Sequence, residues 1–543
     1  MLKKLKCRVK ILLFFFMLCG LYHVNCLIKI QVVENMSWST RAVNQRSDSL
    51  ALYQQRGEIL DCCGRLLTGR EHHTCIAIFP AFLMDDEKKL IFSMTGNQHF
   101  NYQSLSPVLI SNPSKDLLNL SVTNKFPGVT ICTVPLRYGN KPLAHHLLGY
   151  IHPGSGQGLA GLEDVYQEFL SSDTRVKLVL MVDAHHHLIP GLEWRYQEVS
   201  RGKLQKNLVL TIDLTLQQKL EEIMEEKKIT KGVILLLEVG TGKVLALASR
   251  PAFDPYHPQK SFHDPNKPLV NRALQAYPPG SLFKLVLSAV ALETGTITSG
   301  TTFYDSGFID LGGTCYYCST APQNGHGLLT FTQALAYSCH PVFIKVMQMV
   351  ESAKILSVAK ALGLGMQTSL GLPEESAGFL PSSIEAENYV VFALGEQGIL
   401  VSPLQVAGAL QAIASGGYYF PPQIVKGLQE LNGAWYQQSP PSPGRQVLTS
   451  QTAAELRKML ETVVLYGTGT KAQNPHGAAG LTGTVRAGKV SNNGHELYYG
   501  WFAGYAPTHA PRLVGVILLE DDLVGGERAA EIFGLLMSRC LNS

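Results

Sequence analysis

The sequence has little charge. Asp, Glu, Lys and Arg make up 16% of its 543 residues and the formal net charge is only +4, whereas a soluble globular protein carries about 25% charged residues. Several of the positive charges lie within the first ten residues. A nucleic-acid-binding surface needs Lys and Arg clustered on a folded face, so the composition argues against a nucleic-acid partner. It is compatible with a tethered protein.

Long hydrophobic runs are also scarce, and the single strong candidate lies at the N-terminus. The apolar run Ile11–Tyr22 follows five basic residues and continues less cleanly to Ile28; the basic residues are Lys3, Lys4, Lys6, Arg8 and Lys10. Twelve clean apolar residues suit a signal peptide, and eighteen just reach the membrane-spanning range. Because no small-x-small cleavage site follows, the sequence favours an uncleaved anchor over a removed signal. The basic end predicts a single-pass protein of the cell membrane, with a cytoplasmic N-terminus and everything after Lys29 outside the cytoplasm.

The sequence shows no cysteine framework and no nucleotide loop. Its 11 cysteines are odd in number and irregular in spacing, so no disulfide pattern can be read from them. Cys315 and Cys318 have the spacing of a metal-ligand pair, but only His326 lies close by, and structural zinc takes four ligands. The glycine-rich stretch Gly154–Gly158 lacks the Lys-Ser/Thr of a phosphate loop. We therefore predict no metal and no cofactor.

The N-terminal part of the chain has weak secondary-structure signals. Residues 42–55 carry a short helical pattern, and residues 75–135 alternate short apolar runs with Asn, Pro, Ser and Gly, which is typical of irregular β structure. Leu208–Asp213 then predicts a strand that ends in a helix cap, as at the entrance to a new domain. The predicted domains are a basic tail and anchor at 1–28, an elongated β-rich pedestal at 29–207, and a second domain at 208–543.

The second domain has clear strand signals at both of its ends. Gly232–Val239 and Lys243–Ser249 flank Gly240-Thr241-Gly242 and predict a hairpin that is buried on both faces. Further strands are predicted near the C-terminus, and an amphipathic helix over Glu527–Cys540 closes the chain. Strands at both ends with helices between them favour an α+β fold, in which helices cover one antiparallel sheet.

The stretch Tyr277–Lys284 carries the strongest chemical signal. Gly280 can adopt a turn conformation, the prolines prevent a helix before it, and the apolar residues Ser281–Thr294 predict a buried helix. Lys284 lies one turn after Ser281 on the same face, where a desolvated amine can take the proton of a serine nucleophile. Ser-x-x-Lys also occurs at Ser200 and Ser357, so the turn and the buried helix distinguish Ser281. The simpler alternative is a capped core helix.

Several segments together resemble a known family. Tyr277–Lys284, the Ser338-Cys339-His340 motif, the strand Leu481–Thr484 and Gly500–Pro507 resemble, in order and spacing, the transpeptidase domain of penicillin-binding proteins. Upstream, Arg56-Gly57, Leu159–Glu163 and Leu210–Asp213 look like the pedestal of the class B, monofunctional members.

The resemblance implies an acyl-transfer mechanism. In that family a serine attacks the carbonyl between the two terminal D-alanines of a peptidoglycan stem peptide, and an amine of a second stem resolves the acyl-enzyme. Ser281 would be the nucleophile, Lys284 its base, and Ser338 the relay of the proton to the leaving amine. The backbone N–H groups of Ser281 and Thr484 would form the oxyanion hole. The strand Thr482-Gly483-Thr484 would bind substrate, with both hydroxyls holding its terminal carboxylate.

Two positions depart from the family pattern. His340 stands where the family has an asparagine that bonds the lysine and the substrate, and Leu481 stands where the family has a lysine. If His340 replaces the asparagine, acylation should fall as the pH drops through about 6.5. Arg486 shares strand parity with Thr482 and Thr484, so it is a candidate for restoring the missing charge. The alternative is that Arg486 is a solvated residue.

Two functions follow from this resemblance. The first is a peptidoglycan D,D-transpeptidase that binds penicillin, with stem peptides and β-lactams as ligands. The alternative, motivated by Leu481 and His340, is a catalytically impaired relative that acts as a scaffold or regulator in cell-wall synthesis. A hydrolytic β-lactamase ranks third, since such enzymes need no long pedestal. The sequence holds no glycosyltransferase segment, so we expect a polytopic membrane glycan polymerase as partner.

Overall fold

The contacts of the chain define two compact units. The structure is a computed structural model, and it describes residues 2–35, 38, 47–95, 104–123, 126–183, 187–189, 194–200, 202–321, 324–368, 370–491 and 493–542. The first unit comprises Met1–Gln55, His72–Pro135 and Ser172–Leu204, and the second comprises Arg56–Glu71, Leu136–Ser171 and Gln205–Ser543. The second unit thus includes Arg56–Glu71 and Leu136–Ser171, two segments of the region 29–207 that the sequence assigned to the pedestal. The predicted domain boundaries stay a prediction.

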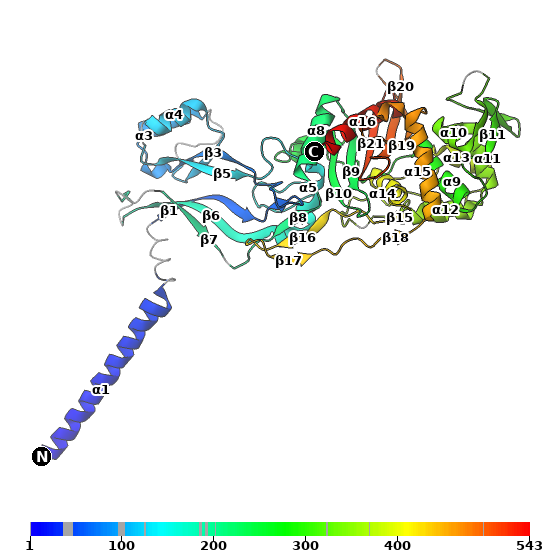
Figure 1. The fold of residues 1–543 in the computed structure, drawn as a ribbon. Helices are drawn as coiled ribbons and strands as arrows, with labels where there is room; N and C mark the ends of the chain where they lie inside the picture. Colours follow the sequence, from blue (N-terminus) through cyan, green and yellow to red (C-terminus); the bar gives the residue numbers. More distant parts are fainter. Residues whose placement is uncertain are drawn as a thin grey trace. The chain divides into compact units, whose positions relative to one another are not determined.

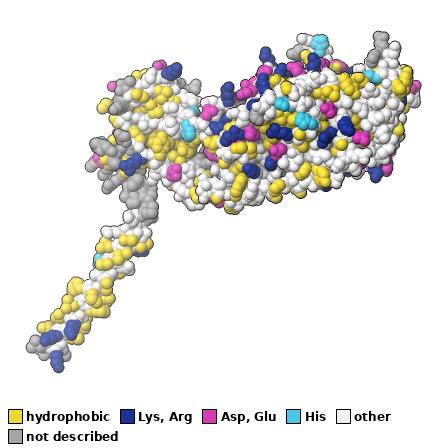
Figure 2. All heavy atoms as spheres, in the orientation of Figure 1, with side chains coloured by type: hydrophobic (Ala, Val, Ile, Leu, Met, Phe, Trp, Pro, Cys, Tyr) yellow, Lys and Arg dark blue, Asp and Glu magenta, His cyan; other side chains and the backbone are white. Residues whose placement is uncertain are grey.

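Helix α1 (Leu2–Ile28) begins the first unit and continues into a short π-helical turn, η1 (Lys29–Val33). The stretch Leu5–Val33 has 29 residues and a mean hydropathy of 2.2, and within the described part of the chain it is the one helix long and apolar enough to cross a membrane. Hydrophobic side chains run along α1 and basic ones lie near its N-terminal end (Figure 2). This helix fits the predicted single membrane anchor.

The first unit also contains two three-stranded sheets, ordered β1-β6-β7 and β4-β3-β5. Their strands are β1 (Ser47–Arg56), β3 (Glu71–Ile78), β4 (Val108–Ser111), β5 (Val129–Leu136), β6 (Ser171–Met181) and β7 (Arg195–Val199). The helical prediction for 42–55 is wrong for its described part, because residues 47–55 belong to β1. Leu50 and Leu52 share the core with Phe79, and their spacing of two is that of a strand. Residues 42–46 lie outside the described residues.

Two helices correct the prediction of β structure alone for 75–135. Helices α3 (Asp85–Met94) and α4 (Lys115–Thr123) lie beside β3 and β5 (Figure 1). Ile91 of α3 and Leu117 of α4 are buried together with Ile76 and Ile78 of β3. The first turn of α3 is acidic, and Glu87 accepts a hydrogen bond from the Met84 N–H at 2.8 Å. Negative charge is favourable at a helix N-terminus, so this signal was present in the sequence.

The second unit is built on an antiparallel five-stranded sheet, ordered β10-β9-β21-β20-β19. Its strands are β9 (Gly232–Glu238), β10 (Val244–Arg250), β19 (Ala479–Val490), β20 (Glu496–Ala506) and β21 (Leu513–Asp522). The predicted hairpin and the three C-terminal strands are confirmed. Strands from the two ends of the unit therefore pair side by side, and β19 forms one edge of the sheet.

Helices cover both faces of this sheet, as the α+β prediction required. Ile234 and Leu236 of β9 pack with helices α8 (Leu214–Glu226) and α16 (Gly526–Leu541). The alternate residues Val233 and Leu235 pack in the larger core, which contains helices α9 (Lys284–Glu293) and α14 (Pro403–Ala414). A strand places successive side chains on opposite faces, so the continuous apolar run 233–237 of β9 fits between two helical layers (Figure 1).

Shorter elements complete the second unit. A four-stranded sheet, ordered β17-β16-β8-β2, contains β2 (Ile59–Leu60), β8 (Asn207–Leu210), β16 (Val425–Gln429) and β17 (Trp435–Gln438). The remaining strands are β11 (Thr302–Asp305), β12 (Phe308–Leu311), β13 (Thr314–Tyr317), β14 (Gly327–Thr330), β15 (Tyr418–Tyr419) and β18 (Arg445–Gln446). The remaining α-helices are α5 (His145–Leu148), α6 (Gly161–Val165), α7 (Gln167–Leu170), α10 (Phe331–Ala336), α11 (His340–Met349), α12 (Ser352–Ala361), α13 (Tyr389–Leu394) and α15 (Ser450–Leu465).

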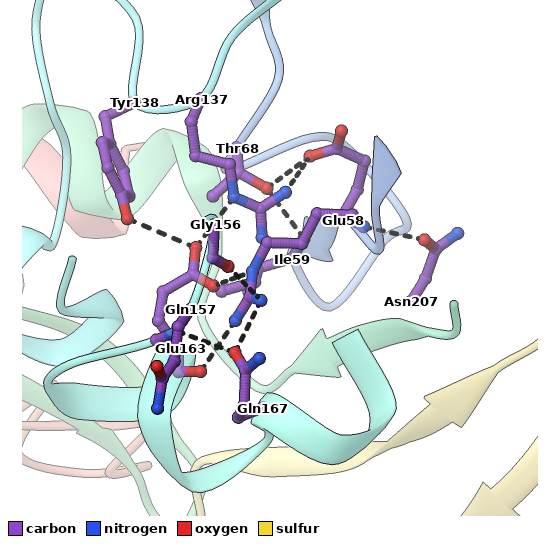
Figure 3. A network of polar contacts seen from close by, with 12 residues as sticks. Glu58, Ile59, Thr68, Arg137, Tyr138, Gly156, Gln157, Glu163, Gln167 and Asn207 are labelled. Carbon is purple, nitrogen blue, oxygen red and sulfur yellow. Dashed lines mark hydrogen bonds and ion pairs between the residues drawn. The ribbon is translucent and has the colours of Figure 1, made fainter. Parts of the chain in front are cut away.

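A buried ion-pair network joins the two early segments of this unit. The completely buried Glu163 carboxylate accepts hydrogen bonds from Arg56 Nε at 2.6 Å and Arg137 Nε at 2.8 Å. Arg137 also pairs with Glu58 at 3.0 Å, and Glu58 N–H donates to Asn207 Oδ1 at 2.9 Å. Arg137 and Glu163 point toward each other in Figure 3. Buried ion pairs thus hold together segments that lie far apart in the sequence.

We expect Glu163→Gln to lower the free energy of unfolding by about 3–5 kcal/mol, because two buried guanidinium groups lose a counter-charge. The matched control is Glu531→Gln, which removes the exposed partner of Lys227 and should cost about 0–1 kcal/mol. Urea unfolding of the detergent-solubilised chain measures both variants. Equal losses for the two variants would contradict a stabilising role for the network.

Candidate active site

The turn at 277–280 is fixed by contacts on several sides. Gly280 has a φ of +57°, and a Cβ at this position would lie 2.5 Å from Val485 Cγ2, so the position requires glycine. Trp501 Nε1 donates a hydrogen bond to Pro278 O at 3.2 Å. Gly280 N–H donates to Gly395 O at 2.9 Å. These contacts set the direction in which the following helix starts.

The predicted buried helix is present, with a tighter first turn than expected. Residues Gly280–Phe283 form a 3-10 turn, η4, and α9 continues from Lys284 to Glu293, where Gly295 with a φ of +67° follows. Every side chain from Lys284 to Ala291 is buried, whereas Ser281 is partly exposed. The helix therefore presents one hydroxyl to solvent and keeps the amine one turn later inside the protein.

A chain of polar contacts connects the two predicted catalytic residues. The Lys284 amine donates hydrogen bonds to Ser338 O and Ser338 Oγ, both at 2.8 Å, and Ser338 Oγ lies 3.0 Å from Ser281 Oγ. The structure thus brings Ser281, Lys284 and Ser338 together, with Ser338 between the other two. The sequence placed Lys284 one turn after Ser281 on the same face and did not predict that Ser338 lies between their polar atoms.

Burial lowers the pKa of the Lys284 amine. Lys284 has no solvent-exposed surface, and desolvation lowers its pKa to about 7. A lysine needs a pKa near the working pH to act as a base, and burial is the physical means of reaching it. The sequence argument required a desolvated lysine amine at this position, and the buried Lys284 amine is desolvated.

Ser338 is held in an unusual backbone conformation. It lies between α10 and α11 with a φ of +53°, a region that side chains other than glycine rarely adopt. Its N–H donates to Leu335 O at 3.0 Å and its carbonyl accepts from Lys284. These bonds aim the hydroxyl at Ser281, and such non-glycine outliers cluster at functional sites.

The edge strand β19 runs beside the nucleophile turn. A Cβ on Gly483 would lie 2.9 Å from Pro279 O, so only glycine allows this close approach. Thr482 Oγ1 is 2.7 Å from Thr468 Oγ1, and Thr484 Oγ1 accepts a hydrogen bond from Gly526 N–H at 3.0 Å. Thr468 was not identified from the sequence, although the flanking glycines in Gly467-Thr468-Gly469 mark its turn.

The two residues linked to the missing charge differ in their surroundings. Leu481 is 1% exposed and lines an apolar pocket with Leu282 and Ala503. The side chain of Arg486 is 78% exposed and pairs with Glu496 at 3.4 Å. The side chain of Arg486 is thus solvated, and its ion-pair partner is Glu496.

His340 begins α11, next to the same site. Its Nε2 lies 3.3 Å from Ser319 Oγ. Burial, and then the nearby Lys284, lower the pKa of His340 to about 3, so the imidazole stays neutral from pH 5.5 to 8. This direction differs from the titration near pH 6.5 on which the predicted pH dependence of acylation rested, and that dependence stays a prediction.

The chain is similar to known proteins in sequence and in fold. The family described as penicillin binding protein transpeptidase domain matches residues 232–538, more than half of the chain. Stage V sporulation protein D of Bacillus subtilis is 28% identical over 547 residues, covering 94% of this chain and 81% of that protein. Peptidoglycan D,D-transpeptidase FtsI of Escherichia coli K12 is 28% identical over 448 residues, covering 77% and 69% of the two chains.

A solved structure extends the likeness to the whole chain. It is described as the structural coordination of polymerization and crosslinking by a peptidoglycan synthase complex. One of its chains superposes with a TM-score of 0.72 at 26% identity, covering 98% of each chain.

Proposed function

The chain belongs to the penicillin-binding protein transpeptidase family, and from this premise we propose that it is a class B peptidoglycan D,D-transpeptidase that forms an acyl-enzyme on Ser281. The observation that carries the proposal is the completely buried Lys284 amine, joined through Ser338 Oγ to Ser281 Oγ. A capped core helix would need neither the buried amine nor the partly exposed hydroxyl.

In the acylation step, Ser281 Oγ attacks the carbonyl carbon of the D-alanyl-D-alanine bond. Its proton passes to Ser338 Oγ as the Ser338 proton passes to the neutral Lys284 amine. The C–N bond then breaks, and the proton returns through Ser338 to the leaving D-alanine nitrogen. In the second half an amine of another stem peptide attacks the acyl-enzyme, gives up its proton to the same chain, and releases Ser281.

The edge strand β19 is the proposed substrate platform. The N–H groups of Ser281 and Thr484 would bind the oxyanion, and such a donor contributes about 3–4 kcal/mol to transition-state stabilisation. Gly483 supports this role because it lets β19 approach the nucleophile turn. The Thr482 and Thr484 hydroxyls would hold the terminal carboxylate, with His340 beside them as a neutral donor.

The proposed setting is the outer face of the cell membrane. Helix α1 would anchor the chain with its basic N-terminus in the cytoplasm. Because the similar solved structure is described as a peptidoglycan synthase complex that coordinates polymerization with crosslinking, we propose a membrane glycan polymerase as partner. β-Lactams would acylate Ser281 as substrate mimics.

The test is crosslinking by the purified full-length chain. Glycan strands with pentapeptide stems are incubated with the protein, and free D-alanine and crosslinked dimers are measured by mass spectrometry. We expect both products, and we expect penicillin to suppress both. A folded chain that releases no D-alanine and resists penicillin would contradict the proposal.

One observation favours a second candidate, the non-catalytic scaffold. Leu481 lines an apolar pocket and stands where the family has a lysine, and a lost charge-assisted hydrogen bond costs roughly 1.5–3 kcal/mol. A scaffold would fold normally without acylation, and its Ser281→Ala form would support wall synthesis as well as the wild type. The crosslinking assay separates the two functions.

The pH dependence of acylation gives an independent prediction. Since the pKa of Lys284 is about 7, its basic form is lost as the pH falls through 7, so the acylation rate at pH 5.5 should be roughly 30-fold below its high-pH plateau. Stopped-flow penicillin acylation measures the profile. His340→Asn is the control and should leave the midpoint in place, whereas a flat wild-type profile between pH 5.5 and 8 would contradict a lysine base.

A further inference from the structure

Four potential metal ligands meet beside the second motif. Asp305, Cys318, His326 and Cys339 each offer one ligand atom, and these atoms all lie within 4.8 Å of one another. Asp305 ends β11, Cys318 follows β13, His326 precedes β14 and Cys339 precedes α11. Figure 1 shows β11, α10 and α11 at the same end of the second unit. The fold thus collects four donors from four separate segments.

The ligand atoms face one another inside the protein. Asp305 and Cys339 are completely buried, and the Cys318 side chain and the His326 side chain are almost so. His326 Nδ1 lies 2.7 Å from Asp305 Oδ2 and 3.8 Å from Cys318 Sγ. Cys339 Sγ lies within 4.8 Å of the ligand atoms of the other three residues. Each donor therefore has at least one other donor as its neighbour.

Further contacts orient the donors. Gly307 N–H donates to Asp305 Oδ1 at 2.8 Å, so the other carboxylate oxygen faces His326. The His326 ring stacks on Tyr337, with ring centroids 5.2 Å apart and planes inclined by 12°. The Cys318 sulfur also lies 3.4 Å from Thr320 Oγ1. Supporting contacts of this kind hold first ligands in place in metal centres.

We propose that this cluster binds one zinc ion, with Asp305, Cys318, His326 and Cys339 as its four ligands. Two sulfurs, one imidazole nitrogen and one carboxylate oxygen form a donor set that suits tetrahedral zinc. Binding releases the two thiol protons to solvent and leaves Nδ1 of His326 as the unprotonated ring nitrogen. Four protein ligands leave no open position, so the site is structural.

The position of Cys339 links this site to the acyl-transfer residues. Cys339 lies between Ser338 and His340, and Ser338 is the residue that contacts both Lys284 and Ser281. A metal bound to Cys339 would therefore restrain the loop between α10 and α11 that carries Ser338. The inference goes beyond the proposed function, because the metal would take no part in bond making.

This proposal reverses the sequence prediction of no metal. The sequence argument paired Cys318 with Cys315, and Cys315 is exposed. The structure replaces Cys315 with Asp305 and Cys339, which lie 13 residues before and 21 residues after Cys318. Ligands this far apart in the sequence have no recognisable spacing until the fold is known.

The test uses the full-length chain, purified with reductant in detergent and loaded with zinc chloride or cobalt chloride. Elemental analysis should find one zinc per chain. The cobalt form should show the absorption of a tetrahedral centre with thiolate-to-cobalt charge transfer. Cys318→Ser should lose most of the zinc and the charge-transfer band, whereas the matched control Cys315→Ser should keep both.

The cobalt spectrum of the wild type decides the matter even if a ligand variant does not fold. Reduced wild-type protein that binds no zinc or cobalt would overturn the proposal. So would equal metal content in Cys318→Ser and wild type, or loss of metal in Cys315→Ser. A further outcome would also overturn it. If the protein as purified contains a Cys318–Cys339 disulfide and binds no zinc after reduction, the two cysteines are a redox pair instead.

Discussion

Replacing Ser281 with alanine is expected to abolish covalent labelling of the chain by a fluorescent penicillin. The hydroxyl is the only part of this side chain that can form the ester, and it is the partly exposed end of the chain of contacts through Ser338 to Lys284. No residual slow labelling is expected, since Ser338 Oγ lies behind Ser281 and is buried. Gel fluorescence after incubation with labelled penicillin measures the effect.

The matched control is Ser288→Ala on the same helix. Ser288 is completely buried, and its hydroxyl has no hydrogen-bond partner among the described residues, so its removal should not cost stability. Labelling should stay at the wild-type level. Equal labelling of Ser281→Ala and wild type would exclude Ser281 as the nucleophile.

The second large effect is expected for Lys284→Met. A positioned base contributes about 10²–10⁴-fold to rate, and methionine fills a similar space without an amine. Since Lys284 is completely buried among apolar residues, the substitution should preserve folding. We expect the rate of penicillin acylation to fall by about two to four orders of magnitude, as measured by stopped-flow quenching.

Lys284→Arg separates basicity from size and hydrogen bonding. Arginine keeps donors that can reach Ser338, but it stays protonated at all working pH values and cannot accept a proton. It should therefore be as slow as Lys284→Met. A variant with arginine that acylates within a few-fold of the wild type would show that the residue only positions Ser338.

The fold of residues 208–543 could be predicted well because its signals are local. The hairpin at Gly232–Ser249 and the C-terminal strands are short apolar runs with turns between them, and the structure pairs them in one sheet. The secondary structure of the first unit was harder to predict. Residues 47–55 and 85–94 have weak hydrophobic patterns, and tertiary contacts decide whether they form a strand or a helix. Propensity is a weak guide where packing decides.

The candidate site shows the same division. Ser281 and Lys284 lie on one turn of helix, so sequence spacing was enough to associate them. The interposition of Ser338, the burial of His340 and the exposure of Arg486 depend on contacts across the fold. Strand parity correctly placed Arg486 on the same face as Thr484, yet it could not show how far the strand end reaches into solvent.

The most direct test of the account is the mass of one peptide. Trypsin releases residues 273–284, which contain a single serine, Ser281. After reaction of the full-length chain with penicillin, the account predicts that this peptide gains the mass of the opened β-lactam, with fragment ions that place it on Ser281. A folded chain whose peptide stays unmodified, or whose adduct lies on Ser338 or elsewhere, would contradict the central claim.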